Sequence, residues 1–533
     1  MKNMIIKNAY IIDGKYNKPF KGDVGIISGK IVLNNIPSNA DLIIDASDKY
    51  LAPGFIDSHT HGDLIMGQEF ATISSVNQGV TTQIAGQCGM SMGPVNPDKI
   101  EEIKSFLSVG TAIFPKEMKS WRTWGEYLEY TNNIDKTLNY KLMVGFNTLR
   151  IAVMGYDDRD PERHELEAMK ELLKEAMEKG AMGLSTGLVY VPGTSANIEE
   201  LVELAKVIRP YDGIYVTHIR NESHDLIKAV EEAIEIGRRA GVRVNISHHK
   251  VMGRGNWGLQ KKSLELISEA REEGLSITCD QYPYDRSMTH LHTTIPPWYF
   301  SDGVEGMLEE IKRTDIREQI KQEMIRDEGK YENLYVNSGG FKGIMISSSS
   351  KTPEAEGLSI DEYSKRLGKD SFDTFFDILI ENNGEVGAVY HAMANQDLFD
   401  IIKAPFTTVG SDALLRSGGD KSHPRAYGTM PHAICLFNKD NKILELEEII
   451  WKMTGLPAEI YGLKSKGIIE DGYDADLVIF DYDKIRDGAT YSNPTEVSEG
   501  IEYVIVKGEI VWKDKLLTGA TPGEIILHTN SRL

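Results

Sequence analysis

The sequence of 533 residues contains only three cysteines and no long apolar run. Cys88, Cys279 and Cys435 are too few and too scattered for a disulfide framework, so a cysteine with a special role is expected to be a metal ligand. The first apolar run is too short for a secretory signal, and no later segment approaches the roughly 18 continuous apolar residues of a membrane span. We therefore expect a soluble, cytoplasmic protein.

Basic side chains are also scarce. Lysine and arginine total 59 against 80 aspartates and glutamates, which gives a formal net charge of −21. A field of this sign repels phosphate backbones and anionic lipids, so nucleic acid and membranes are poor candidates as partners. The length exceeds one average domain, so we expect a large domain with a smaller companion.

The two ends of the chain share one pattern. Short β-type runs separated by turns fill residues 1–52, and similar runs return near the C-terminus, with a hairpin turn expected at Lys507-Gly508. We therefore predict one small β-sandwich domain built from residues 1–52 and 465–533.

Residues 53–464 instead alternate helical and strand patterns. The stretches with apolar residues at helical spacing, each followed by a short β-rich run, are 166–177, 198–208, 225–240 and 264–273. This alternation predicts a parallel sheet, and the number of units favours a catalytic (β/α)8 TIM-like barrel, an α/β fold, over a doubly wound sheet. No Gly-x-Gly-x-x-Gly follows an early strand, which also weighs against the doubly wound fold. Residues 285–345 fit the alternation poorly and are expected to hold an insertion or lid.

Residues of metal-ligand type lie at the predicted strand ends. In a barrel of this kind, side chains at the carboxyl ends of the strands converge on one mouth. His59 and His61, two apart on the first predicted barrel strand, project from one face. A lone strand-end histidine, aspartate or cysteine is more often a satisfied polar group or a small buried side chain, but coincidence at six strand-end positions favours a metal site. The six residues are His59, His61, Cys88, His218, His248 and Asp412.

Several longer motifs surround these residues. They are Pro53-Gly54-Phe55-Ile56-Asp57-Ser58-His59-Thr60-His61, Gly86-Gln87-Cys88-Gly89, Gly183-Leu184-Ser185-Thr186-Gly187-Leu188-Val189-Tyr190-Val191-Pro192-Gly193, Thr217-His218-Ile219-Arg220-Asn221-Glu222, Ile246-Ser247-His248-His249-Lys250, Asp280-Gln281-Tyr282-Pro283-Tyr284, Gly410-Ser411-Asp412 and His423-Pro424-Arg425-Ala426-Tyr427-Gly428-Thr429. With these motifs the chain resembles, essentially end to end, the D-aminoacylase (N-acyl-D-amino-acid deacylase) family of the amidohydrolase superfamily.

The resemblance implies a zinc-dependent hydrolase of linear amides. Its ligand pattern places one tightly held zinc ion on Cys88, His218 and His248, with a weaker metal position formed by the remaining three residues of the set. Thiolate and imidazole suit zinc, and a metal with an open position lowers the pKa of its bound water from 15.7 to about 7, so that a hydroxide can attack an amide. The resemblance makes Asp412 the proton shuttle to the departing nitrogen. The implied products are a D-amino acid and a carboxylate.

Four further residues are expected to bind the substrate. By the resemblance, Arg425 and Tyr190 hold the α-carboxylate, which suits the two parallel hydrogen bonds of a guanidinium. Lys250 and Tyr282 are expected to line the pocket for the substrate side chain.

The chain departs from the family pattern in two places. Phe146 stands where family members commonly carry a histidine, and Asp285-Arg286-Ser287-Met288 replaces a run of small residues. We hypothesise that Arg286 attracts an acidic substrate side chain, although it could equally pair with Asp285.

Two alternative functions remain at this stage. One is the hydrolysis of cyclic amides such as hydantoins or dihydropyrimidines, but those relatives carry a carboxylated lysine where this chain has Cys88. The other is a non-catalytic scaffold that has lost its metal, against which the complete ligand set argues.

Overall fold

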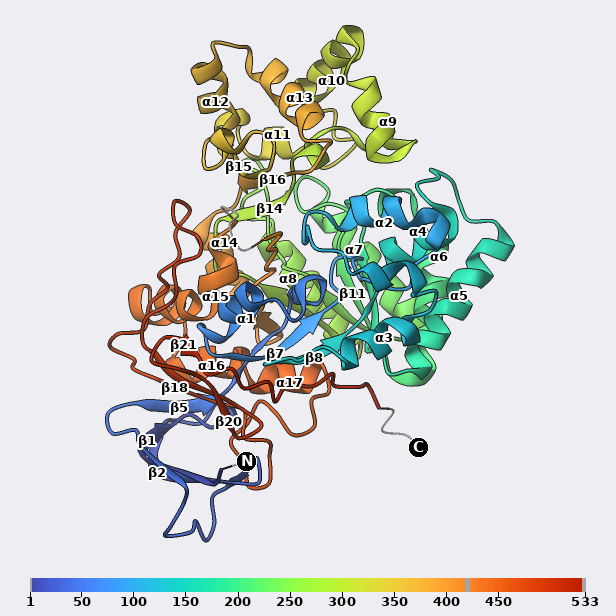
Figure 1. The fold of residues 1–533 in the computed structure, drawn as a ribbon. Coiled ribbons are helices and arrows are strands. Elements are labelled where there is room, and N and C mark those ends of the chain that lie inside the picture. The colour runs from blue at the N-terminus through green and yellow to red at the C-terminus, as the bar shows by residue number, and fades with distance from the viewer. Residues whose placement is uncertain (1, 418–421, 530–533) are drawn as a thin grey trace.

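The computed structural model describes residues 2–417 and 422–529 of the chain. Residues 530–533, part of the C-terminal segment assigned above to a sandwich, lie outside this description. The molecule has a sheet at one end, a central layer of parallel strands surrounded by helices, and a smaller unit at the opposite end (Figure 1).

Both ends of the chain join one nine-stranded sheet. Strand β5 (Tyr50–Pro53) pairs antiparallel with β18 (Leu477–Phe480), and β1 (Met4–Ile11) lies on the other side of β5. The remaining strands are β2 (Phe20–Ile27), β3 (Lys30–Val32), β4 (Leu42–Asp45), β19 (Ile501–Val506), β20 (Glu509–Lys513) and β21 (Leu516–Leu517). Between β19 and β20, Lys507 and Gly508 have φ angles of 47° and 79°, the left-handed backbone of the tight hairpin turn that the sequence predicts.

The centre of the molecule consists of parallel strands, as the sequence predicts. A six-stranded sheet has the order β17-β13-β12-β11-β10-β9, and a three-stranded sheet has the order β6-β7-β8. The strands are β6 (Phe55–Asp57), β7 (Val80–Ala85), β8 (Asn139–Leu142), β9 (Val144–Gly145), β10 (Gly183–Gly187), β11 (Ile214–His218), β12 (Arg243–Ile246), β13 (Ile277–Gln281) and β17 (Thr407–Val409). Every residue of β7, β10, β11 and β13 is buried, which is the expected state of parallel strands covered on both faces.

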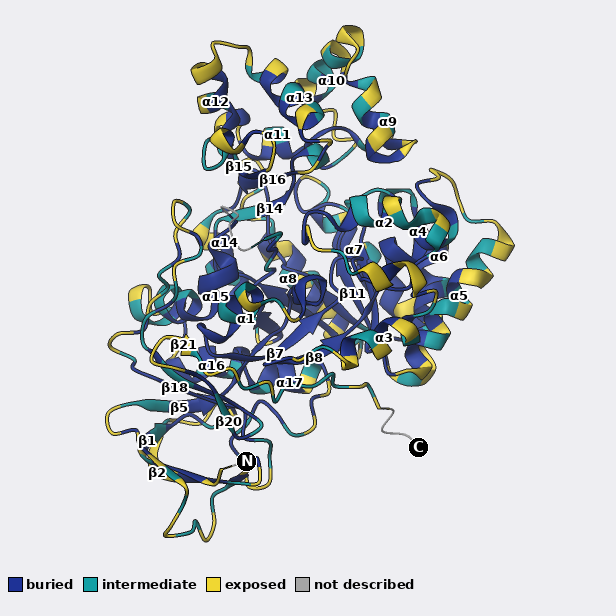
Figure 2. Cartoon of the chain, in the orientation of Figure 1, coloured by how far each residue is buried: buried dark blue, intermediate teal, exposed yellow. Residues whose placement is uncertain are grey.

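Amphipathic helices cover these strands. Helix α7 (Leu226–Ala240) buries Leu226, Val230 and Ala233, and it ends at Gly241, whose φ of 68° is the left-handed cap that glycine provides. Figure 2 shows the inner faces of the helices buried and their outer faces exposed. The other helices of this part are α1 (Glu69–Val76), α2 (Ile100–Leu107), α3 (Trp124–Asn132), α4 (Phe146–Met154), α5 (Arg163–Glu178), α6 (Ile198–Ile208), α8 (Gln260–Glu272), α14 (Asn395–Lys403), α15 (Arg425–Ala433), α16 (Leu446–Lys452) and α17 (Gly455–Ile460). No helix within the described ranges is both long and apolar enough to cross a membrane.

A separate antiparallel unit interrupts the alternation between β13 and β17. Strands β14 (Arg286–His290) and β15 (Ile344–Ser349) both pair with β16 (Val386–His391). The helices of this unit are α9 (Gly303–Glu310), α10 (Thr314–Arg326), α11 (Leu334–Asn337), α12 (Ile360–Leu367) and α13 (Ser371–Glu381). They pack around an apolar cluster distinct from that of the central strands, and the unit stands at the top of Figure 1. We call residues 285–393 the insertion; the sequence segment 285–345 lies inside it.

Candidate metal centre

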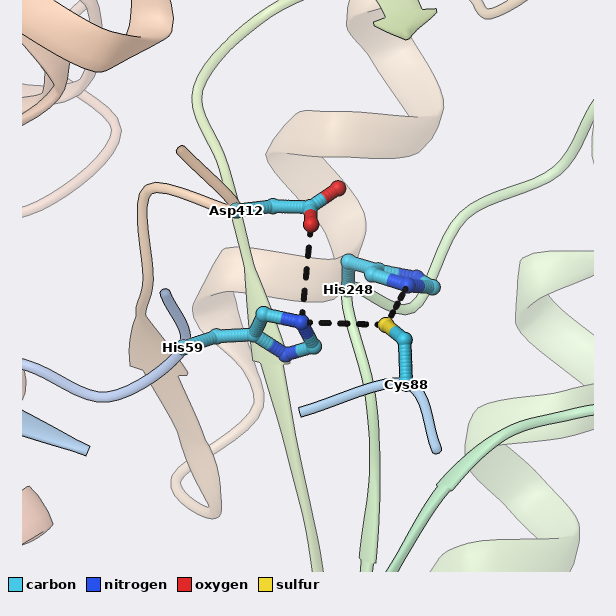
Figure 3. A group of neighbouring side chains, drawn as sticks. All are labelled: His59, Cys88, His248 and Asp412. Carbon is cyan, nitrogen blue, oxygen red and sulfur yellow. Dashed lines mark hydrogen bonds and ion pairs between the residues drawn. The ribbon is translucent and has the colours of Figure 1, made fainter. Parts of the chain in front are cut away.

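Four side chains of metal-ligand type converge beyond the ends of four parallel strands. His59, Cys88, His248 and Asp412 follow β6, β7, β12 and β17, and one ligand atom from each lies within 4.8 Å of those of the others (Figure 3). Cys88 Sγ is 3.3 Å from His59 Nε2 and 3.3 Å from His248 Nε2, and all four side chains are buried. Strand ends of parallel sheets are where such side chains meet.

The prediction that His59 and His61 lie on a strand was wrong. Strand β6 stops at Asp57, whose carboxylate accepts hydrogen bonds from Ser411 N at 2.8 Å and Ser411 Oγ at 2.5 Å, and Thr60 then forms an isolated bridge with Ala413. These contacts draw the segment toward the residues after β17. As a result, His59 Nε2 and His61 Nε2 lie 3.5 Å and 3.2 Å from Asp412 Oδ1.

The backbone is unusual at three of these positions. Cys88, His248 and Asp412 have φ angles of 52°, 33° and 50°, a left-handed conformation that side-chain-bearing residues rarely adopt. Such strain persists where surrounding contacts hold it, and it occurs preferentially at functional sites. The backbone at Cys88 also packs against Gly187, where only glycine fits, because a Cβ at that position would lie 2.3 Å from the Cys88 carbonyl oxygen.

Two carboxylates that the sequence analysis left without a role orient the imidazoles. Glu222 Oε1 lies 3.0 Å from His248 Nδ1 and 2.6 Å from Lys250 Nζ, and Asp280 Oδ1 lies 3.0 Å from His59 Nδ1. A carboxylate on the far nitrogen fixes the ring and its tautomer, a common arrangement around ligating histidines. Asp280 is the next-to-last residue of β13, so a criterion based on strand ends could also have found it. Glu222 lies four residues after His218, beyond the end of β11.

His218 stands beside this group. Its ring centroid is 4.3 Å from that of His248, and its Nε2 is 3.6 Å from Glu222 Oε2. Within the described parts of the chain neither ring nitrogen of this buried side chain makes a hydrogen bond. A buried polar group without a partner is costly, and here the orphaned nitrogens face other donors of the type that bind zinc. The donor set therefore fits a zinc ion. His249 is directed elsewhere, with its Nε2 2.8 Å from Ser263 Oγ on α8.

Burial and local charge set the protonation of the site. Burial, reinforced by Lys250, holds the pKa values of His218 and His248 well below the usual range, so both rings are neutral as metal ligands must be. Burial raises the pKa of the Cys88 thiol to about 11. For Asp412, burial alone would raise the pKa, but Arg425 and the nearby imidazoles outweigh it and hold the pKa well below its ordinary value. Asp412 is therefore an anion.

The structure places the four expected substrate residues around this centre. Arg425 Nη1 is 2.8 Å from Asp412 Oδ2, and its guanidinium carbon lies 4.7 Å from the Tyr282 ring centroid. The ring of Tyr190 is 5.1 Å from that of His218, and Lys250 pairs with Glu222 as described. The pocket lined by Tyr190, Lys250, Tyr282 and residues 287–289 has a volume of about 30 Å³, room for one or two water molecules.

The two departures from the family pattern lie outside this pocket. Phe146 is the buried first residue of α4. The Arg286 guanidinium lies 4.1 Å from the Tyr491 ring centroid, and its Nε is 3.9 Å from Asp285 Oδ1. Neither side chain is among the described residues that line the pocket.

Comparison with known proteins identifies the family. The amidohydrolase family model matches residues 42–274 and 354–512. Two curated relatives from Alcaligenes xylosoxydans xylosoxydans are similar over nearly the whole chain. One, D-aminoacylase, is 32% identical over 99% of this chain and 98% of its own length. The other, N-acyl-D-aspartate deacylase, is 33% identical over 98% of this chain and 95% of its own length.

Two solved structures share the fold. A D-aminoacylase structure, described in terms of its binuclear metal centre, has a TM-score of 0.82 at 31% identity, covering 98% of this chain and 99% of that one. N-acyl-D-glutamate deacylase from Bordetella bronchiseptica, complexed with zinc and a phosphonate that mimics the tetrahedral intermediate, has a TM-score of 0.81 at 30% identity over the same shares. With its family match, its full-length relatives and its cluster of strand-end metal donors, the chain belongs to the amidohydrolase family.

Proposed function

We propose that this enzyme is a zinc-dependent N-acyl-D-amino-acid deacylase, which hydrolyses a linear amide to a D-amino acid and a carboxylate. One observation carries the proposal: a buried thiol lies 3.3 Å from each of two imidazoles, next to a carboxylate that is ion-paired with a buried arginine. The full-length similarity to D-aminoacylase and to N-acyl-D-aspartate deacylase supports the substrate class.

We assign residues to the two metal positions as the sequence predicts. Cys88, His218 and His248 would hold the tight zinc ion, and His59, His61 and Asp412 would form the weaker position. The orphaned nitrogens of His218 and the proximity of Cys88 to His248 support the first group. The contacts of both other histidines with Asp412 support the second. When bound, zinc supplies a Lewis acid and an acidified water at neutral pH.

Asp412 is positioned to move the proton. As an anion it can accept a proton on Oδ1, the oxygen that faces the imidazoles, while Oδ2 remains 2.8 Å from Arg425. It can then deliver that proton to the departing nitrogen, which an amide needs because an amide anion is a very poor leaving group. The low pKa favours the charged form from which the cycle starts.

Arg425 and its neighbours can bind the α-carboxylate. The buried guanidinium forms an ion pair through Nη1 with Asp412 Oδ2 at 2.8 Å, and its Nη2 donates a hydrogen bond to the Met288 carbonyl oxygen at 3.3 Å. Its Nε and the Tyr282 hydroxyl make no hydrogen bond within the described residues, so two buried donors remain available for a carboxylate. Tyr190, beside His218, supplies a further hydroxyl, which now accepts a hydrogen bond from Thr289 Oγ1 at 3.2 Å.

We further propose that the two parallel sheets form one (β/α)8 barrel over residues 53–464. Strand β9 begins two residues after the end of β8, so we count these two short strands as one. With this count, the described residues supply the eight parallel strands of a barrel. Closure is supported by the hydrogen bond from Ser58 N to Val409 O at 3.4 Å and by the bridge between Thr60 and Ala413. The nine-stranded sheet from residues 1–52 and 465–533 would be the companion domain.

The insertion would serve as a lid. Its residues 287–289 line one side of a pocket that holds only about 30 Å³, and movement of this wall would make room for a substrate. Movement of this kind both admits the substrate and excludes water during reaction.

The test is a panel of substrates offered to zinc-loaded protein: N-acetyl-D- and N-acetyl-L-amino acids, a hydantoin and a dihydropyrimidine. Release of acetate from the D substrates alone supports the proposal. Ring opening without acetate release would favour a cyclic-amide hydrolase. No turnover of any substrate by fully loaded protein would favour a non-catalytic scaffold.

A further inference from the structure

A second, larger cavity adjoins the pocket at the metal centre. Its volume is about 190 Å³, and it shares the lining residues Val189, Tyr190, Thr293 and Glu332 with that pocket. The shared wall lies close to the reacting groups, because the ring of Tyr190 is 5.1 Å from that of His218 and Glu332 accepts a hydrogen bond from Glu222 N at 2.7 Å. The cavity therefore lies next to the space in which a substrate would be held at the metal centre.

The cavity is the right size for a sizeable apolar group. Its wall includes the side chains of Met90, Phe106, Leu188, Ile295 and Phe300, all of them buried. An apolar cavity of about 150 Å³ holds benzene, so 190 Å³ accommodates a phenyl ring or a branched aliphatic chain. His290 also lines the cavity, and burial holds its pKa well below the usual range, so it contributes no positive charge at neutral pH.

The cations near this space are already paired. Of the described residues lining the cavity, Arg220 makes contacts of 3.0–3.1 Å with both carboxylate oxygens of Glu232, and Lys330 is exposed and pairs with Glu328 at 2.7 Å. At the metal centre Lys250 is paired with Glu222. A carboxylate on the substrate side chain would thus be buried without a partner, which is unfavourable.

We propose that the cavity receives an uncharged apolar part of the substrate, of about phenyl size, and that the enzyme discriminates against N-acyl derivatives of D-aspartate and D-glutamate. The inference rests on the proposed deacylase function and names its substrate class. Either the acyl group or the amino-acid side chain can supply the apolar group, because both are attached next to the scissile amide.

Two substrate series separate these sources. One varies the side chain of N-acetyl-D-amino acids through alanine, leucine, phenylalanine, aspartate and glutamate. The other varies the acyl group on D-alanine through acetyl, butanoyl, hexanoyl and phenylacetyl. We expect kcat/KM to rise at least about tenfold with apolar size in one series, the order of discrimination that a hydrophobic pocket provides. The series that rises identifies the end of the substrate in the cavity. Values for the two acidic substrates should lie at least about tenfold below that for the leucine derivative.

Variants at Ile295 test whether the apolar part of the substrate binds in this cavity. Ile295 lines the cavity but not the pocket at the metal centre. Ile295→Phe should remove the preference for the larger substrate, while its turnover of N-acetyl-D-alanine should stay within about threefold of that of the unsubstituted enzyme. Ile295→Ala should shift the preferred substrate to one with a longer apolar group. Ile320→Ala is the matched control, since Ile320 is equally buried in the same apolar cluster and does not line the cavity. It should leave the size preference unchanged.

Calorimetric titration of the metal-free protein gives a readout independent of turnover. N-phenylacetyl-D-alanine or N-acetyl-D-phenylalanine should bind more tightly than N-acetyl-D-glutamate, and Ile295→Phe should abolish the difference. An acidic substrate that ranks first in kcat/KM or in binding would overturn the inference, as would identical size profiles for the Ile295 and Ile320 variants. If zinc-loaded protein hydrolyses no N-acyl-D-amino acid, the proposed function fails, and the titration alone decides whether the cavity binds apolar groups.

Discussion

Replacing Glu222 by glutamine should weaken zinc binding without removing any metal ligand. The side chain is buried, with Oε1 3.0 Å from His248 Nδ1 and 2.6 Å from Lys250 Nζ. Glutamine keeps the shape and removes the charge, which lowers the basicity of His248 and leaves the Lys250 ammonium without its counter-ion. Both effects disfavour a cation at the site. Loss of a carboxylate behind a ligating histidine typically costs about 10–100-fold in metal affinity, or about 1.4–2.8 kcal/mol.

Competition with a chromogenic chelator measures this change as a ratio of zinc dissociation constants. The matched control is Glu232→Gln, which removes a carboxylate paired with Arg220 at 3.0 Å, on α7 and away from the metal donors. It should leave zinc affinity within about twofold. An unchanged zinc affinity in Glu222→Gln, or an equal loss in both variants, would refute the role assigned to Glu222.

Three further predictions concern the centre itself. Asp412→Asn should lower kcat about 10²–10⁴-fold while protein-bound zinc stays at one equivalent, measured by steady-state kinetics and metal analysis; a loss below about tenfold would contradict the shuttle. Cys88→Ala should lose its zinc whereas the double variant His59→Ala, His61→Ala keeps it, and the reverse result would invert the order of the two positions. Because burial raises the pKa of the Cys88 thiol to about 11, zinc binding must release a proton at neutral pH. The apparent zinc affinity should therefore rise at least about tenfold per pH unit between about pH 6 and pH 8, and a flat profile would contradict a thiolate ligand.

The repeating elements could be predicted from the sequence because their signals are local. The periodic stretch 225–240 coincides with α7 to within one residue, and the run 214–218 is β11, since an apolar stripe and a glycine stop define each unit. The insertion was harder to delimit. Its strand β14 pairs with β16, about 100 residues later, and no local pattern indicates a partner at that distance.

The candidate site could likewise be predicted only in part from the sequence. The strand-end rule identified Cys88, His248 and Asp412, which the fold brings together, but it placed His59 on a strand that ends two residues earlier. It also gave no role to Glu222, because only the fold shows that this carboxylate is buried against His248. Sequence reports which residue types stand at strand ends, whereas their contacts with one another depend on backbone turns, such as the left-handed ones at Cys88 and His248.

One titration tests the central claim, that zinc held by Cys88 and its neighbouring histidines drives hydrolysis of N-acyl-D-amino acids. Chelator-stripped protein receives increasing zinc while amino-acid release from N-acetyl-D-leucine and from its L enantiomer is followed. The account predicts no release without zinc and a rise on the D substrate alone that approaches its maximum near one equivalent. Hydrolysis that is independent of zinc, or that prefers the L substrate, would contradict it.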